Sequence, residues 1–429
     1  MNILLTGATG FIGNAVLREL LRQGHQVTAC CRHPERLLID HPKLTLLTLD
    51  FAKAGKIECW LPHLQGIDAI VNCVGIIAES KHQSFAQLHT QAPTALFQAG
   101  AQVGIQKIVQ LSALGSDADA KSAYHLSKKV ADDALRELTV DWFVLQPSLV
   151  YGPGGQSSGL FHALAAFPVH FLPDGGRQLL QPIHIADLAT AVCHCLEPAV
   201  SGRQSLALVG PSPITYADWL QGLRRRLGKP KAKTCAIPYQ YALTMAGMGK
   251  WLGEPILSKD NLAMLNRGNC SDSGPISVLL GHSPASVNQA LFEQPASQAE
   301  RWHAGLYFLK PLLRYVIAFV WLWSGITSLF FYPHQLSYLL LAPLGINGFG
   351  APMALYGLAA MDIALGLATL ARLRIRSLML WQFWIVLGYS AAVAACLPEF
   401  VFHPFGPLLK NLPFLMCLLM VRAMEGEQS

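Results

Sequence analysis

Hydrophobic and polar positions follow two different patterns along the chain. Over roughly the first 295 residues, short apolar runs alternate with stretches in which apolar residues recur every three or four positions. This alternation is typical of a parallel sheet whose strands are joined by crossover helices, so we expect a doubly wound parallel α/β domain over residues 1–295. The predicted strands are 3–6, 26–31, 44–49, 69–73, 107–112 and 142–146, and the predicted helices include 93–103 and 123–137.

Residues 160–295 have a less regular pattern, with a strand-like run at 205–209 and a helical pattern at 216–227. In doubly wound proteins such a region lies over the carboxyl ends of the strands, where ligands bind. We therefore expect a small capping region that contributes the substrate pocket.

Long apolar stretches replace this alternation from residue 311 onward. Residues 311–331, 351–371 and 378–397 each approach the roughly 20 apolar residues that cross a bilayer as a helix. A fourth stretch, 405–421, is shorter and contains Lys410, Asn411 and Pro413. We predict an α-helical four-span membrane bundle over 311–429, joined to the α/β domain by a linker at 296–310. Hydrophobic residues make up 52% of the chain and charged residues 14%, which fits a soluble domain fused to a membrane domain.

Basic residues, apart from Lys410, flank these stretches on alternate sides. Lys310 and Arg314 lie at the start of the first stretch, three arginines lie between the second and third at 372–376, and Arg422 follows the fourth. The connections 332–350 and 397–404 contain no lysine or arginine. By the positive-inside rule, we expect both termini and the α/β domain on the cytoplasmic side of a bacterial inner membrane. The chain starts directly with a strand pattern and without a signal peptide, which agrees with this orientation.

Asp362 falls near the middle of the second apolar stretch. An ionised carboxylate is costly there and usually faces a partner or a water-filled cavity. It either fixes helix packing, with Ser324, Gln382 or Tyr389 as partner, or forms a site for a proton or a quinone-like head group.

The net charge of +6 is partly concentrated in one basic run. No recognition motif or stacking aromatic accompanies this run, so nucleic acid is not an expected partner. The run forms either a solvated helix end or a contact with anionic membrane lipid. The ten cysteines form no CxxC pair, and we interpret Cys193-His194-Cys195 as helix packing rather than a metal site. The basic run comprises Arg224, Arg225, Arg226, Lys229, Lys231 and Lys233.

A glycine-rich turn follows the first predicted strand and precedes an amphipathic stretch. Gly7 permits a tight turn, Gly10 allows a pyrophosphate to approach the backbone, and Gly13 allows the helix to pack on the strand. The helix N-terminus then offers free N–H groups to the phosphates. The sequence therefore predicts a dinucleotide site whose contacts in this turn are Gly7, Thr9, Gly10, Phe11, Ile12 and Gly13.

Arg32 stands about 20 residues beyond this turn, where a domain that binds NAD has Asp or Glu. A guanidinium pairs with the 2′-phosphate of NADP(H) and gains nothing comparable from a hydroxyl. We therefore expect NADP(H) to be preferred over NAD(H).

Three further residues point to catalysis. Ser112 ends the fifth predicted strand, and Tyr124 and Lys128 lie four residues apart on the next helix, on one face. The ammonium of Lys128 is expected to lower the pKa of the Tyr124 phenol, which is otherwise about 10, so that Tyr124 can transfer a proton. Ser112 would hold the substrate oxygen, and Lys128 would also reach the nicotinamide ribose.

These residues resemble the short-chain dehydrogenase/reductase superfamily, in its extended or atypical branch, over about residues 1–295. The resemblance implies a Rossmann fold, and the pattern is closest to bacterial relatives of the nucleotide-binding accessory subunit of respiratory complex I. Gln146, where the family often has arginine, disfavours an anionic or sugar-nucleotide substrate. The resemblance further implies that Asp50 and Phe51 hold the adenine, that Cys73, Val74 and Gly75 pass beside its ribose, and that Pro147 lies beside the nicotinamide.

The second half is similar to DoxX-like four-helix membrane proteins. The resemblance rests on the segment 341–345, on Asp362 with 366–370, and on the segment 397–413. It implies a quinone-linked redox or oxidative-stress function.

Three functions agree with these features. The first is a membrane-anchored NADPH-dependent oxidoreductase acting on a lipophilic carbonyl or quinone-like substrate. The second is an epimerase or dehydratase with a retained cofactor. The third is a non-catalytic nucleotide-binding protein that serves as an assembly or redox-sensor component with a membrane protein partner.

Overall fold

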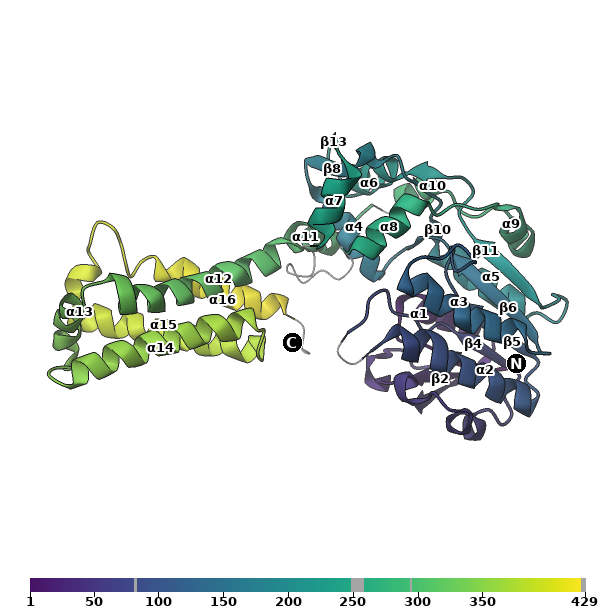
Figure 1. Ribbon diagram of the computed structural model, residues 1–429, viewed down its shortest axis with the longest axis horizontal. Coiled ribbons are helices and arrows are strands. Elements are labelled where there is room, and N and C mark those ends of the chain that lie inside the picture. Colours follow the sequence, from purple (N-terminus) through teal and green to yellow (C-terminus); the bar gives the residue numbers. More distant parts are fainter. Residues whose placement is uncertain (81–82, 248–257, 294, 426–429) are drawn as a thin grey trace. The chain divides into compact units, whose positions relative to one another are not determined.

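The computed structural model describes residues 1–80, 83–247, 258–293 and 295–425, which form two compact units, Met1–Ala304 and Gly305–Ser429. The first unit contains a seven-stranded sheet of order β11-β6-β5-β4-β1-β2-β3, in which all neighbouring strands are parallel (Figure 1). The chain reverses its direction of progress across the sheet between β1 and β4, as in a doubly wound domain. The predicted fold class is confirmed. The strands are β1 (Asn2–Thr6), β2 (Gln26–Cys31), β3 (Leu44–Thr48), β4 (Ala69–Asn72), β5 (Lys107–Leu111), β6 (Asp141–Pro147) and β11 (Gln204–Leu208).

The predicted extent of the capping region is wrong at one place, the edge strand β11. The pattern assigned 205–209 to that region, but β11 pairs in parallel with β6 in the main sheet. The chain thus returns to the sheet once more after the first capping elements, which a local pattern does not reveal.

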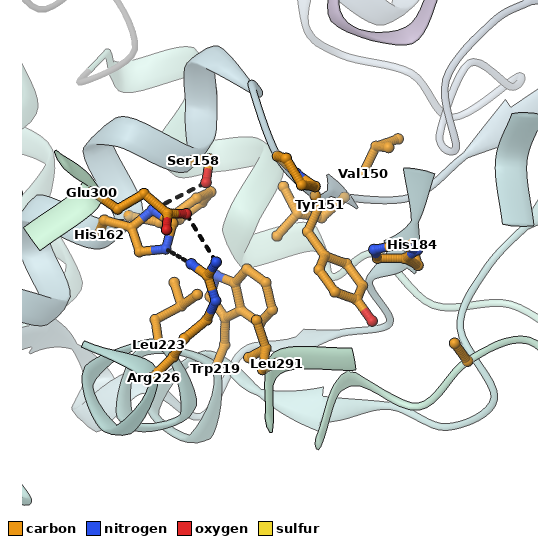
Figure 2. A pocket seen from close by; sticks show the side chains of 15 residues that line it. Val150, Tyr151, Ser158, His162, His184, Trp219, Leu223, Arg226, Leu291 and Glu300 are labelled. Atoms are coloured by element: carbon orange, nitrogen blue, oxygen red, sulfur yellow. Dashed lines mark hydrogen bonds and ion pairs between the residues drawn. The ribbon is translucent and has the colours of Figure 1, made fainter. Parts of the chain in front are cut away.

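The capping region contains three short strand pairs, β7–β10, β9–β12 and β8–β13, together with several helices. Trp219 and Leu223 of α6 form a separate core with Ala165 of α4 and Leu291 of α10. A cavity of about 200 Å³ lies beside this core (Figure 2). The elements are β7 (Val150–Tyr151), α4 (Gln156–Ala166), β8 (Val169–Pro173), β9 (Leu179–Leu180), β10 (Ile183–His184), β12 (Ile214–Thr215), α6 (Tyr216–Arg226), β13 (Lys233–Ile237), α7 (Tyr239–Gly247), α8 (Lys259–Arg267), α9 (Gly274–Leu280), α10 (Val287–Glu293) and α11 (Gln298–Leu306).

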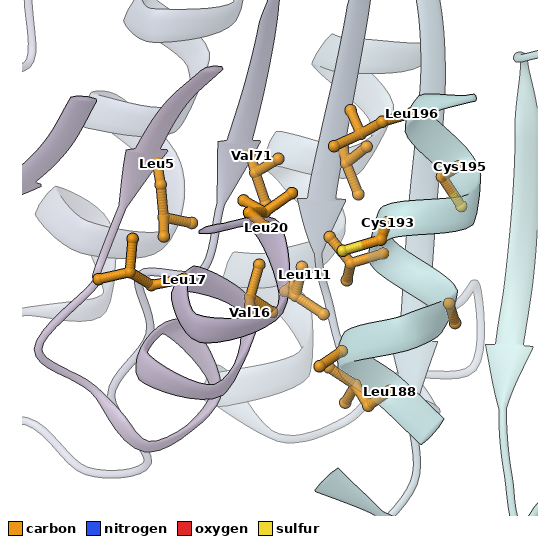
Figure 3. Packing of buried hydrophobic residues seen from close by; sticks show 14 of the residues in the cluster. Leu5, Val16, Leu17, Leu20, Val71, Leu111, Leu188, Cys193, Cys195 and Leu196 are labelled. Atoms are coloured by element: carbon orange, nitrogen blue, oxygen red, sulfur yellow. The ribbon is translucent and has the colours of Figure 1, made fainter. Parts of the chain in front are cut away.

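Apolar side chains at alternate strand positions fill two cores, one on each face of the main sheet. Leu5 of β1 packs with α1 and α5 on one face, whereas Leu4 packs with α2 and α3 on the other. Cys193 and Cys195 are buried free thiols in the first of these cores (Figure 3), so the packing interpretation of this cluster is confirmed. The four helices are α1 (Phe11–Arg22), α2 (Ala92–Val103), α3 (Ala123–Arg136) and α5 (Ile185–Leu196).

Two arginines of the basic run form structural contacts inside the capping region. Arg224 is buried and donates to the carbonyl oxygens of Ala165, Ala166 and Phe167 at 2.8–3.0 Å. Arg226 pairs with Glu300 at 2.8 Å. Neither a solvated face nor a lipid contact describes these two residues, because their guanidinium groups bind partners within the domain.

The second unit contains the predicted apolar helices. Three of the helical segments described there are long and apolar enough to cross a membrane: 309–331, Gly350–Leu370 and Ile375–Cys396. The fourth, α16, begins at Asn411 rather than at 405 and has 14 residues, so it spans about 21 Å where the bilayer core measures about 30 Å. The four predicted spans thus correspond to three membrane-length helices and one shorter apolar helix among the described residues. The helices are α12 (Leu309–Ile326), continued by a π-helical turn (Thr327–Phe331), α13 (His334–Leu341), α14 (Gly350–Leu370), α15 (Ile375–Cys396) and α16 (Asn411–Met424).

Several buried polar groups inside this unit are paired with one another. The indole of Trp321 donates to Gln382 at 2.9 Å, and the Gln382 amide donates to Thr369 at 2.8 Å. Glu425, which is buried, lies 3.1–3.5 Å from three cations, Lys310, Arg314 and Arg372.

Candidate functional site

The glycine turn lies against the end of β4 and leaves room for glycine only. Gly7 has a φ of 77°, and a Cβ added there would lie 2.9 Å from the carbonyl carbon of Cys73. A Cβ at Gly13 would lie 2.1 Å from the Gly7 carbonyl oxygen. No side chain caps α1, so the N–H groups of its first turn, at Phe11 to Gly13, are available to an anion. Thr9 and Gly10 are exposed beside this turn.

The other residues of the predicted site follow the carboxyl ends of neighbouring strands. Arg32 is exposed directly after β2. After β3, the Asp50 carboxylate accepts a hydrogen bond from the Ala52 N–H at 3.2 Å, and Phe51 is buried edge-to-face against Trp60. Because parallel strands end at one edge of the sheet, the structure brings these residues to the edge that carries the glycine turn. The same edge holds Cys73, Val74 and Gly75 after β4, Ser112 after β5, and Pro147 at the end of β6.

Lys128 is buried between the ends of β4 and β5. Its ammonium donates to the carbonyl oxygens of Leu111 at 2.8 Å and Val74 at 3.1 Å. Burial lowers the pKa of Lys128 to about 8, partly offset by the carboxylate of Asp132. Lys128 therefore lies beside the segment predicted to pass along the ribose, as a cation held by two carbonyl groups.

Tyr124 is packed among three aromatic rings, those of Phe85, His89 and His125, at centroid distances of 5.3–6.1 Å. Burial raises its pKa to about 12, and the charge of Asp132 acts in the same direction. The predicted lowering of this pKa is thus wrong, because burial disfavours the phenolate and the negative charge of Asp132 disfavours it further. Among the described residues, the Tyr124 hydroxyl has no hydrogen-bond partner.

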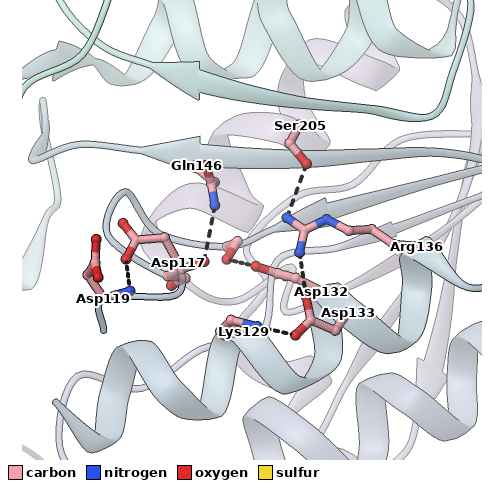
Figure 4. Close-up of polar contacts among 10 residues, drawn as sticks. Asp117, Asp119, Lys129, Asp132, Asp133, Arg136, Gln146 and Ser205 are labelled. Atoms are coloured by element: carbon pink, nitrogen blue, oxygen red, sulfur yellow. Dashed lines mark hydrogen bonds and ion pairs between the residues drawn. The ribbon is translucent and has the colours of Figure 1, made fainter. Parts of the chain in front are cut away.

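The Ser112 hydroxyl bonds to a carboxylate that the sequence analysis did not identify. Ser112 is buried and donates to Asp132, one helical turn beyond Lys128 on α3. Burial raises the pKa of Asp132 to about 6. Figure 4 shows Asp132 next to Asp133, which pairs with Lys129 and Arg136 instead. The structure thus brings Ser112 into the site but gives its hydroxyl an acceptor within the protein.

His89 is a further residue that the sequence analysis missed. It lies in a π-helical turn (Ala86–Gln91) before α2, and its Nε2 accepts the Ile76 N–H at 3.0 Å. Burial lowers its pKa to about 2, so the ring is neutral and Nδ1 donates to Ser127 Oγ at 2.9 Å. Ser127 donates in turn to the Tyr124 carbonyl at 2.8 Å. These hydrogen bonds connect the end of β4 to the helix that carries Tyr124. The local feature that points to a functional role for His89 is its π-helical turn, since such turns are common at functional sites.

A buried network links the ends of β1, β4 and β5. Thr6 donates to Asn72 at 2.5 Å, and Asn72 donates to Gln110 at 2.7 Å. Asn72 also accepts the Val74 N–H at 3.2 Å. These bonds fix the backbone on which the carbonyl partners of Lys128 lie.

In the second unit, Asp362 accepts a hydrogen bond from Ser324 at 2.7 Å. Ser324 was one of three candidate partners, whereas Gln382 bonds to Trp321 and Thr369. The pair joins α12 to α14.

Comparison with known proteins agrees with this geometry. Residues 7–162 match the family described as NAD(P)H-binding, and residues 318–419 match the DoxX-like family. The chain is 22% identical over 262 residues to the NADH-ubiquinone oxidoreductase 40 kDa subunit of Neurospora crassa, covering 60% of this chain and 68% of that protein. It is 24% identical over 233 residues to a ceramide reductase of Caulobacter vibrioides, covering 53% and 72%. A structure of UDP-glucuronic acid 4-epimerase from Bacillus cereus in complex with NAD has the same fold, with a TM-score of 0.54 and 18% identity over 72% of this chain and 100% of that one.

The first unit therefore has a Rossmann fold and contains an NAD(P)H-binding domain. The chain joins this domain, which is related to the complex I accessory subunit and the extended short-chain dehydrogenases, to a DoxX-like membrane domain. Both predicted resemblances are confirmed.

Proposed function

We propose that this protein is a membrane-anchored, NADPH-dependent oxidoreductase that reduces a lipophilic carbonyl or quinone-like substrate. The observation that carries the proposal is the Tyr124 hydroxyl, which has no partner among the described residues and lies one helical turn before Lys128 on α3, the helix that follows β5. A domain that only binds nucleotide needs no proton donor at this place.

The residues at this edge fit a nicotinamide dinucleotide. The uncapped first turn of α1 suits a pyrophosphate, and the Lys128 ammonium lies beside the predicted ribose segment. When bound, the reduced cofactor supplies a hydride. With a pKa of about 12, Tyr124 is protonated at neutral pH and acts as the acid that donates to the substrate oxygen. Lys128 stabilises the phenolate that remains, and the His89–Ser127 chain orients the helix.

Arg32 supports a preference for NADPH over NADH. It follows β2, is exposed, and so can pair with a 2′-phosphate without first losing a partner. The proposed location is the bacterial inner membrane, with the Rossmann domain in the cytoplasm and membrane lipid around the second unit.

The Ser324–Asp362 pair supports a role for the membrane unit beyond anchoring. A carboxyl in an apolar helix that accepts one hydrogen bond keeps an oxygen that can take up a proton, and the protonated carboxyl can then donate to a quinone carbonyl. We expect Asp362→Asn to reduce activity with a long-chain quinone and to leave activity with a short, soluble quinone unchanged. Ser324→Ala should have a smaller effect in the same direction, and equal loss with both substrates would contradict this role.

Two alternative functions each have one supporting observation. The Ser112 hydroxyl is bound by Asp132 rather than presented to a substrate, which favours a nucleotide-binding component that works with a membrane protein partner. The fold shared with an NAD-bound epimerase favours an epimerase or dehydratase.

Anaerobic incubation of the full chain in detergent with NADPH and a quinone or lipophilic ketone distinguishes these functions. Stoichiometric NADPH oxidation with formation of the quinol or alcohol supports the reductase. Tightly bound nucleotide that no acceptor reoxidises supports the binding component, and product formation without net cofactor oxidation supports the epimerase.

A further inference from the structure

The cavity of about 200 Å³ in the capping region contains none of the residues assigned above to the nucleotide site or to catalysis. The β7 segment supplies Val150 and Tyr151 on one side, and α6 supplies Trp219 on the other (Figure 2). Phe161 of α4 also lines the cavity. Leu291 of α10 contributes a further apolar wall. A cavity of about 150 Å³ is enough to hold a benzene ring, whereas drug-sized ligands occupy pockets of about 300–1,000 Å³. This cavity therefore matches one ring with small substituents.

The cavity is linked to the nucleotide turn by one short loop. Tyr151, Gly152 and Pro153 line it, and two residues further on Gly155 lies against the ring of Phe11, the first residue of α1. A Cβ at Gly155 would come within 3.2 Å of that ring. One segment thus lines the cavity and also contacts Phe11, the first residue of α1, at whose N-terminus the pyrophosphate is predicted to bind.

The charged groups of the cavity neutralise one another. Arg226 pairs with Glu300 at 2.8 Å and donates to His162 Nε2 at 3.1 Å. His162 bonds through Nδ1 to Ser158 at 3.0 Å, and burial together with the Arg226 charge lowers its pKa. These linked groups form one side of the cavity in Figure 2 and have no net charge at neutral pH. A nucleotide diphosphate would lose its hydration here without a compensating positive charge.

Two hydrogen-bond donors at the cavity have no acceptor in the part of the chain that the structure describes. The Tyr151 hydroxyl and the Trp219 indole nitrogen are both buried and unpaired, and the two rings meet edge-to-face at 5.5 Å. Leaving such a group unpaired costs about 1–3 kcal/mol. Both donor atoms are inaccessible as the side chains stand, so a ligand oxygen reaches either one only after that side chain rotates, and the new hydrogen bond would then remove part of that cost.

We propose that this cavity binds the uncharged ring of a carbonyl compound of the quinone or cyclic enone class, whose oxygen accepts a hydrogen bond from Tyr151 or Trp219. The inference deepens the proposed function by naming the substrate class, and it rests on that function for the link to hydride transfer.

Equilibrium binding to the full chain in detergent tests the proposal without turnover. The probe is duroquinone, whose ring is fully substituted and does not add thiols, and UDP-glucuronic acid is the charged comparison. Duroquinone should bind at least tenfold more tightly than UDP-glucuronic acid. The reverse order would overturn the proposed ligand class.

Substitutions in the cavity locate the binding. Trp219→Phe keeps a ring but removes the donor, and we expect about fivefold weaker duroquinone binding. Leu223→Trp fills the cavity and should weaken binding more than tenfold, with retained NADPH binding showing that the variant is folded. Trp302→Phe, on an exposed position of α11, is the matched control and should change nothing. Unchanged duroquinone binding in both cavity variants would overturn the proposal.

Glu300→Gln tests the role of charge. It leaves Arg226 without its carboxylate, so UDP-glucuronic acid should bind about tenfold more tightly while duroquinone changes less than twofold. Glu58→Gln, at an exposed position far along the chain, should affect neither ligand. If duroquinone binds in the cavity but no carbonyl oxidises NADPH, the proposed function fails and the cavity assignment stands. If NADPH is oxidised by quinones and the cavity variants do not matter, the cavity assignment fails.

Discussion

The two units of this protein bury polar groups in different ways. In the Rossmann domain, Lys128, Ser112 and Asp132 gather at one sheet edge with unequal partners: two carbonyls hold the lysine, and one carboxylate oxygen of Asp132 is unpaired. In the membrane unit, Gln382 bonds on both sides and Glu425 is held by three cations. A sheet edge can gain its missing partners from a ligand or water, whereas a bilayer offers none. Pairing in the membrane unit is extensive but not complete, since Arg314 Nε and the Thr327 hydroxyl have no partner among the described residues. Incomplete pairing at the sheet edge therefore differs mainly in that a bound ligand or water can supply the missing partners there.

The largest expected effect tests the reactive side of this comparison. Tyr124→Phe should lower turnover by a factor of about 10³, because it removes the proton donor. The affinity for NADPH should change less than twofold, since the ring keeps its contacts with Phe85 and His89. NADPH oxidation and a separate NADPH titration measure the two effects. Tyr241→Phe, at an exposed tyrosine of α7, is the control; full activity of Tyr124→Phe would favour the non-catalytic function.

The second prediction tests the paired side. Glu425→Gln leaves the buried Arg314 and its two neighbouring cations without a countercharge, and we expect a loss of about 3 kcal/mol in stability. Thermal unfolding of the full chain in detergent, followed by loss of the monodisperse chromatographic peak, measures this effect. Glu399→Gln, which is exposed in a connecting loop, should leave the Tm unchanged. An unaltered Tm for Glu425→Gln would show that the three contacts are not stabilising.

The third prediction concerns a residue that has no partner until cofactor binds. Arg32→Ser should weaken NADPH binding by a factor of roughly 10–100 through loss of a charge-assisted contact, and should leave NADH binding within twofold. Titration of both reduced cofactors against the same preparation gives the ratio. Arg18→Ser, on the exposed side of α1, is the comparison variant. Tighter binding of NADH than of NADPH by the unaltered protein would refute the preference.

The smallest expected effect is the pH dependence of stability contributed by Asp132. Its pKa is about 6 in the folded chain and about 4 when unfolded, so the folded state binds the proton more tightly. Stability from this group is therefore present below about pH 4 and is lost as the pH rises to about 6. Asp132→Asn keeps an acceptor for Ser112 and should flatten this part of the curve. The Tm of both proteins between pH 4 and 7 tests it, and parallel curves would contradict the assignment.

Local pattern was enough for much of the fold. The strand at Gln26–Cys31 has the predicted bounds, and the helix at Ala123–Arg136 ends within one residue of its prediction. The glycine turn could also be predicted from the sequence. Gly7 and Gly13 lie so close to neighbouring backbone atoms that no larger residue fits at either position. Residue type and spacing predict these features because each feature depends on contacts within one turn or one strand–turn–helix unit.

Other features depended on residues far apart in the chain. Ser112 meets Asp132, His89 joins Ile76 to Ser127, and β11 returns to pair with β6. These contacts join residues that are far apart in the sequence, so the spacing of residue types along the chain does not predict them.

By itself the sequence determined the order of elements, the dinucleotide turn and the apolar helices, because these follow from side-chain period and from the space that glycine leaves. The tertiary structure decided the pKa values of the buried groups and the hydrogen-bond partners of the polar side chains. It packed the half-buried Tyr124 among aromatic rings, so that the pKa of its phenol rises instead of falling, and it turned Arg224 inward to three carbonyl oxygens. Burial and electrostatics act through space, and only the folded chain brings those groups within reach of one another.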